Sequence, residues 1–156
     1  MQTLGKQYPI LEENVLKKFE FLEHTSDVYI AAYGKSLKDA YENAAYAMFQ
    51  TMTELDSVNP ETKVEVAVEG DDEESLLYNW LESLLIKFEV DELLFSKFKI
   101  KELERLGKFR LTAEAYGEQY DPERHISKVA IKAVTYHGME IKKGKEQFIV
   151  KVLFDI

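Results

Sequence analysis

The clearest pattern along the chain is a helical repeat of apolar positions that follows Ser36. Apolar side chains recur there at alternating steps of three and four residues, at Leu37, Ala40, Tyr41, Ala44, Ala45, Met48, Phe49 and Met52. Such steps place side chains on one face of an α-helix, and serine is a favoured residue at a helix N-cap. The pattern therefore predicts an amphipathic helix that begins just after Ser36.

A second helix is predicted in the segment GDDEESLLYNWLESLLIKF, residues 70–88. Asp71 and Asp72 are capping candidates, and the acids after them suit the positive end of a helix dipole. The apolar stripe of this helix consists of Leu76, Leu77, Trp80, Leu81, Leu84, Leu85 and Phe88.

Strands are predicted where apolar and polar residues alternate, or where β-branched and aromatic residues gather. Residues 63–70 show the alternation most clearly, with Val64, Val66 and Val68 on one face and the charged Lys63, Glu65 and Glu69 on the other. The other predicted strands are residues 27–34, 94–104, 108–117, 127–137, 138–143 and 147–155. This combination predicts an α+β fold, with two amphipathic helices packed on a largely antiparallel β-sheet.

The domain is expected to span residues 19–156. Residues 1–18 contain Pro9 and no sustained periodic pattern of apolar positions, so we expect them to form an N-terminal extension outside the domain. The length of 156 residues and the hydrophobic content of 46% suit a single domain with a buried core. No apolar run approaches the roughly 20 residues that span a bilayer, and the first residues lack a signal-peptide pattern, so we expect a cytoplasmic protein without a membrane partner.

The charge and the missing motifs exclude several classes of protein. The chain has 29 acidic and 20 basic residues and a net charge of −9, so its average surface repels nucleic acid, and direct binding would need a local basic patch. The absence of cysteine excludes disulfides and thiolate metal sites. The glycines have neither GxGxxG nor P-loop spacing, which excludes nucleotide-binding folds of those two kinds. The sequence contains no GxSxG or HExxH motif, so it gives no local support for a serine hydrolase or a two-histidine zinc hydrolase.

Two acids at the edges of apolar strands are candidates for metal binding. Asp27 and Asp155, together with the main-chain carboxylate of Ile156, would offer hard oxygen ligands, which suit Ca²⁺ or Mg²⁺ better than zinc. Both faces of the last predicted strand carry apolar residues, so a carboxylate there is expected to need a partner. The alternative is that Asp27 caps a turn and Asp155 pairs with a lysine, and from the residues alone we favour that alternative.

The histidines and one lysine are weaker candidates. His24, His125 and His137 lie in segments at strand edges, where a histidine is more often a hydrogen-bonded structural residue than a catalyst. Lys132 lies on a predicted strand, where it could point to a partner phosphate, although exposure to solvent is the default for lysine.

Several segments, taken together and in this order, resemble the archease family. They are EHTSDVYIAAYGKSLKDAYENAAYAMFQTMT, EGDDEESLLYNWLESLLIKFEVDELLFSKF, AYGEQYDPERH, KAVTYHGMEI and the closing FDI, and the match covers residues 19–156. The resemblance implies a cytoplasmic accessory protein, not an enzyme, that activates an RtcB-type RNA ligase in tRNA splicing and RNA repair. It would promote guanylylation of the ligase histidine and multiple turnover.

The resemblance also implies roles for individual residues. Asp27 matches the family motif H-T-x-D, although Ser26 stands where alanine is commoner, and Asp155 and Ile156 match the closing D-I. These three residues are implied to bind a divalent metal, Ca²⁺ first and Mg²⁺ or Mn²⁺ as alternatives, with Ile156 acting through its main-chain carboxylate. His24, Lys132 and His137 are the candidates for contact with the partner or for activation.

Two other functions remain open. The archease family has also been linked to tRNA methyltransferases, which implies a chaperone or modulator of such an enzyme. A stand-alone metal-dependent phosphoesterase that uses Asp27, Asp155 and His24 is the third possibility, although this ligand set is sparse for a two-metal centre.

Overall fold

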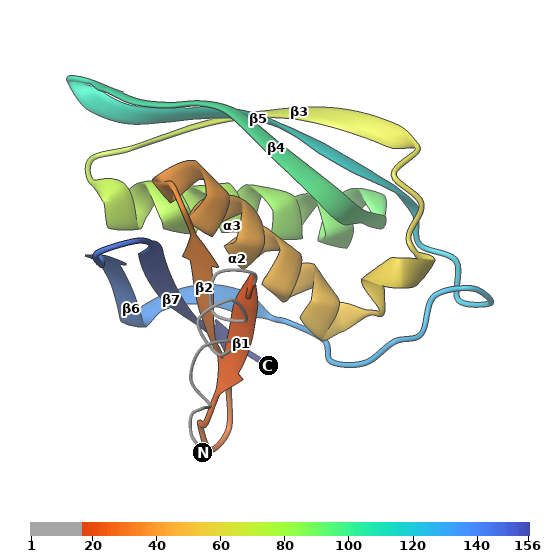
Figure 1. The fold of residues 1–156 in the computed structure, drawn as a ribbon. Coiled ribbons are helices and arrows are strands. Elements are labelled where there is room, and N and C mark those ends of the chain that lie inside the picture. The colour runs from red at the N-terminus through yellow and green to blue at the C-terminus, as the bar shows by residue number, and fades with distance from the viewer. Residues whose placement is uncertain (1–16) are drawn as a thin grey trace, which may run out of the picture.

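Two helices lie between two antiparallel sheets in the computed structural model, which describes residues 17–156 (Figure 1). The proposed extension, residues 1–18, therefore lies almost entirely outside the described residues. The four-stranded sheet has the order β1-β2-β7-β6, with β1 Phe19–Leu22, β2 Val28–Gly34, β7 Phe148–Asp155 and β6 Ala133–Lys143. The three-stranded sheet has the order β3-β5-β4, with β3 Thr62–Gly70, β5 Lys108–Gln119 and β4 Leu93–Leu106.

Both predicted helices are present, with the expected caps. Helix α2 spans Leu37–Met52, and the Ser36 hydroxyl accepts a hydrogen bond from the Asp39 N–H at 3.1 Å. Helix α3 spans Glu73–Asp91, and the Asp72 carboxylate accepts from the Ser75 N–H at 2.7 Å. A short 3-10 helix, η1 Leu55–Ser57, follows α2.

The core lies on both sides of the helices. Apolar side chains of α2 and α3 are buried along the predicted stripes, and Trp80 is fully buried, with its indole N–H donating to the Tyr41 carbonyl at 3.0 Å. Ile30 and Val152 reach this core from one sheet, and Leu111 reaches it from the other. No helix within residues 17–156 is long and apolar enough to cross a membrane.

The predicted α+β class is confirmed, but its details differ in three respects. The strands form two sheets rather than one, and β1 was not predicted. Residues 127–132 were predicted as strand but are not, because the Lys128 N–H bonds the Met52 carbonyl at the end of α2 instead of a neighbouring strand. Residues 133–143, predicted in two pieces, form the single strand β6 with an interrupted register.

Candidate functional site

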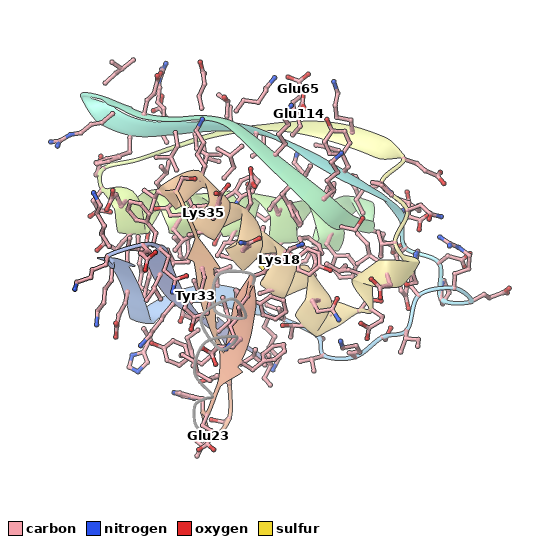
Figure 2. All side chains as sticks on the ribbon, in the orientation of Figure 1. Lys18, Glu23, Tyr33, Lys35, Glu65 and Glu114 are labelled. Atoms are coloured by element: carbon pink, nitrogen blue, oxygen red, sulfur yellow. The ribbon has the colours of Figure 1, made fainter. Side chains whose placement is uncertain are left out.

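The loop between β1 and β2 projects from one end of the molecule and carries two of the predicted site residues. Glu23 is labelled at the end of this projection in Figure 2, and the C-terminus lies beside the hairpin in Figure 1. His24 and Asp27 follow within the same loop, and we call residues 23–27 the tip. The His24 Nδ1 and the Asp27 Oδ2 are 3.8 Å apart, with side chains 32% and 24% exposed.

Strand register brings the other candidates to the tip. Val28 stands opposite Phe154 and Ala133 stands opposite Asp155, so the start of β2, the end of β7 and the start of β6 meet at one end of the sheet. The Lys132 N–H donates to the Asp155 carbonyl oxygen at 2.7 Å. Residues far apart in sequence thus converge here through backbone pairing.

The surroundings of Asp155 differ from our expectation. Leu153, on the face of β7 that points away from the helices, is only 4% exposed, so this strand is covered on both faces as the pattern suggested. Asp155 itself is exposed, as is Ile156 at 38%. The side-chain carboxylate of Asp155 is therefore solvated and needs no buried partner.

The donor set at this end suits a hard cation but is small. Within residues 17–156, no three or more His, Asp or Glu side chains lie close enough together to hold an ion. Asp27 and Asp155 provide two carboxylates, and the main-chain carboxylate of Ile156 would be the third anionic group. Ca²⁺ takes 6–8 oxygen ligands, so water would have to complete its coordination.

Tyr29, which sequence reasoning missed, connects the tip to the neighbouring part of the sheet. Its hydroxyl donates to the Gly138 carbonyl at 2.6 Å, and its ring lies edge-on to His24 with centroids 5.9 Å apart. Burial, and next the charge of Glu140, raise the pKa of Tyr29, so its hydroxyl keeps its proton. The available signal was the spacing, because Asp27 and Tyr29 are two residues apart and share one face of an extended chain.

Lys132 lies next to Asp155 and His137 lies within β6, and both are exposed. His137 immediately precedes Gly138, the residue that Tyr29 holds. The exposed Lys132 side chain agrees with the default for lysine, while its backbone fixes the end of β7. The structure thus places His24 next to Asp27 and Lys132 next to Asp155, while His137 lies in β6 and is connected to the tip through Gly138 and Tyr29.

His125 has the structural role expected for it, in another part of the molecule. It is 2% exposed, and its Nδ1 accepts the Asp121 N–H at 2.9 Å. In the neutral ring the proton must then be on Nε2, which lies 2.9 Å from a Glu118 oxygen and donates to it. Glu118 also accepts the Asn59 N–H at 2.8 Å, so the pair ties two loops together.

A cleft of about 740 Å³ lies at the opposite end of β2, beside its last residue Gly34, and was not predicted. Figure 2 labels Lys18, Tyr33 and Lys35 in its wall. Among residues 17–156, the charged residues that line it are Lys17, Lys18, Lys35 and Lys145 with Asp39, Glu42 and Glu146. These charges nearly cancel, so electrostatics favours neither anionic nor cationic ligands there.

Comparison with known proteins shows consistent similarity across the described domain. The model of the Archease protein family (MTH1598/TM1083) matches residues 19–156. "Protein archease" of Sulfurisphaera tokodaii is 43% identical over 141 residues, which are 90% of this chain and all of that protein. "Protein archease" of Methanosarcina acetivorans is 46% identical over 141 residues, 90% of this chain and 97% of that protein.

Solved structures agree with the sequence comparison. The solution structure of Methanobacterium thermoautotrophicum protein 1598 matches with a TM-score of 0.80 and 39% identity, covering 89% of this chain and 99% of that one. The crystal structure of an archease and possible chaperone from Thermotoga maritima matches with a TM-score of 0.57 over 86% of this chain, and at 17% identity it shows the fold alone. By sequence and by fold, the chain belongs to the archease family.

Proposed function

We propose that this protein is a cytoplasmic, non-catalytic activator of an RtcB-type RNA ligase in tRNA splicing and RNA repair. The observation that carries the proposal is the meeting of Asp27, Asp155 and Lys132 at one end of the sheet, in a chain of the archease family. The activator would promote guanylylation of the ligase and multiple turnover.

Asp27, Asp155 and the main-chain carboxylate of Ile156 would hold a divalent cation, Ca²⁺ first and Mg²⁺ or Mn²⁺ as alternatives. The ion would supply positive charge to which nucleotide or RNA phosphates can bind. The Lys132 N–H holds the Asp155 backbone in place, while the exposed Lys132 ammonium group is free to meet a phosphate of the partner complex. His24 lies edge-on to Tyr29 and adds an imidazole as a further donor or acceptor, whereas His137 is an exposed residue of β6.

The net charge of the whole molecule agrees with a role in which this protein contacts the ligase rather than RNA. A protein with a net charge of −9 repels nucleic acid over most of its surface. Contact with RNA would therefore be left to the ligase, and this protein would enter the complex with its tip.

The direct test is single-turnover guanylylation of the cognate ligase with and without this protein. We expect faster formation of the ligase–GMP adduct with the wild-type protein and a loss of most of the acceleration with Asp27→Asn or Asp155→Asn. Glu65→Gln is the matched control, because Glu65 is an exposed acid on the other sheet (Figure 2), and it should accelerate the reaction normally. Equal rates with and without the wild-type protein would contradict the proposal.

A second candidate is a chaperone or modulator of a tRNA methyltransferase. The observation in its favour is that the Thermotoga maritima protein of the same fold is described as a possible chaperone. Purification of the native complex from its own cells separates the two functions, because it yields either the ligase or the methyltransferase. Release of phosphate from RNA 3'-phosphates by the isolated protein would instead support a phosphoesterase.

A further inference from the structure

Strand β6 leaves its regular pairing with β7 next to the tip. Thr135 stands opposite Leu153 and Glu140 stands opposite Lys151, so the four residues 136–139 face only one residue of β7. We call residues 136–139 the β6 bulge. A common β-bulge adds one residue, so this excursion is larger than usual. Gly138 has a φ of 71°, which side-chain-bearing residues rarely adopt, so the local sequence favours the excursion.

Aromatic side chains hold the β6 bulge from two directions. From β2, the Tyr29 hydroxyl bonds the Gly138 carbonyl at 2.6 Å, and Gly138 lies so near the ring that an added Cβ would come within 3.5 Å of it. From α3, Tyr78 stacks on Tyr136 with centroids 4.4 Å apart and planes 7° apart. The bulge is therefore a fixed feature of the surface.

The fixed bulge presents side chains suited to a protein contact. Tyr136 is 52% exposed although it is stacked, and His137 is exposed. Tyrosine is enriched at protein interfaces, and a ring already held in place loses little conformational entropy when a partner covers it. β6 is an edge strand, but the bulge interrupts its hydrogen-bonding edge, so a partner would meet side chains here rather than add a strand.

Tyr29 also joins this surface to the tip. Its ring contacts His24 in the tip loop, and its hydroxyl contacts the bulge. We infer that Tyr136 and His137 form a second contact with the ligase whose active site the tip approaches, and that Tyr29 is the positioning residue that fixes the bulge relative to the tip. The identity of the partner rests on the proposed function, whereas the positioning role of Tyr29 does not.

The first experiment isolates the Tyr29 hydroxyl. Tyr29→Phe keeps the ring and removes one hydrogen bond, so hydrogen exchange at the amides of residues 136–139 should become about fivefold faster, as expected for a net loss near 1 kcal/mol. Tyr33→Phe is the matched control. Tyr33 lies on the same face of β2, and its hydroxyl bonds Glu20 instead, so this variant should leave the bulge amides unchanged. Unchanged exchange in Tyr29→Phe would overturn the positioning role.

The second experiment measures guanylylation of the cognate ligase at increasing concentrations of the full-length activator. Tyr136→Ala, His137→Ala and Tyr29→Phe should each raise the half-saturating concentration several-fold, with a nearly unchanged maximal rate and unchanged Ca²⁺ affinity of the isolated protein. Tyr33→Phe should behave as wild type. A purely structural defect would instead lower the fraction of active protein, and so the maximal acceleration per mole added, without this selective shift.

The outcomes separate the two proposals. One outcome is that Tyr136→Ala and His137→Ala leave the half-saturating concentration unchanged while Asp27→Asn abolishes activation. That result would overturn the second contact and leave the proposed function standing. A wild-type protein that does not activate the ligase would overturn the proposed function and the contact together. In that case the exchange experiment would still decide the role of Tyr29.

Discussion

At the scale of single residues, the main-chain carboxylate of Ile156 gives the sharpest test of the metal site. Extending the chain by a few residues after Ile156 moves this charge away and leaves a neutral carbonyl. We expect the fold to persist and Ca²⁺ affinity, measured by isothermal titration calorimetry, to fall about tenfold or more, equivalent to about 1.4 kcal/mol or more. An equal extension placed before residue 1 is the control. If both forms bind Ca²⁺ as tightly as the unextended chain, Ile156 is not a ligand.

Glu118 gives a prediction about acid stability. Burial raises its pKa, but hydrogen bonds from the Asn59 N–H, His125 and Arg124 outweigh burial and hold the pKa below its ordinary value of 4.5. A carboxyl group whose pKa is lowered in the folded state stabilises the fold fully at pH values above its ordinary pKa. This stabilisation is lost as the pH falls through the lowered pKa of the folded state. Glu118→Gln should therefore lower the unfolding free energy at neutral pH, by about 1.5–3 kcal/mol.

Urea denaturation at several pH values checks this prediction. The difference in unfolding free energy between wild type and Glu118→Gln should shrink as the pH falls below 4.5. Glu65→Gln, at an exposed position, should leave the unfolding free energy nearly unchanged. A difference that stays constant across this range would mean that the charge of Glu118 does not contribute to stability.

At the scale of elements, the close approach of β4 and β5 depends on one glycine. A Cβ at Gly117 would lie 1.7 Å from the Leu94 carbonyl oxygen, so Gly117→Ala forces the two backbones apart. We expect a loss of about 3 kcal/mol in unfolding free energy, at the upper end of overpacking costs. Gly107→Ala is the contrasting variant, because no atom of residues 17–156 would lie within 4 Å of the added Cβ, and the positive φ of 78° adds strain of about 1 kcal/mol. Equal denaturation midpoints for the two variants would contradict this assignment.

The sequence located most elements because their signals are local. Apolar spacing and caps mark the helices, and alternation marks β3. Local patterns do not say which strands pair, so the division into two sheets was missed, as was the four-residue strand β1. The sequence divided this region into two strands at Gly138, whereas the structure has one strand, β6, with a register shift there, because β6 pairs with β7 on both sides of the shift.

For the candidate site, the sequence proposes the residues, but it does not indicate how the structure brings them together. Asp27 and Asp155 attract attention as acids beside apolar strands, and the resemblance to a family singles them out. Their proximity follows from the β2–β7 register, which is a long-range property. Tyr29 was missed because a tyrosine in a strand is typical of packing, and its bond to Gly138 crosses from β2 to β6.

At the scale of the whole molecule, burial of both helices between sheets predicts cooperative unfolding. The chain has a single tryptophan, Trp80, which is fully buried in the shared core. Its fluorescence should therefore report loss of the whole core, and its unfolding transition should coincide with that of far-UV circular dichroism. Separate transitions would mean that the two sheets unfold independently.

The order of strands in the four-stranded sheet also has a consequence for biosynthesis. β2 is made early, but its partner β7 is made last, after α2, the whole three-stranded sheet, α3 and β6. Pairing of such distant segments is slow and comes late in folding. A nascent chain on the ribosome can therefore pack its helices against β3, β4 and β5 while the end that carries Asp27 is still unfinished. Chains that terminate before residue 148 would lack β7 altogether, and so could not present a partly competent tip to a partner.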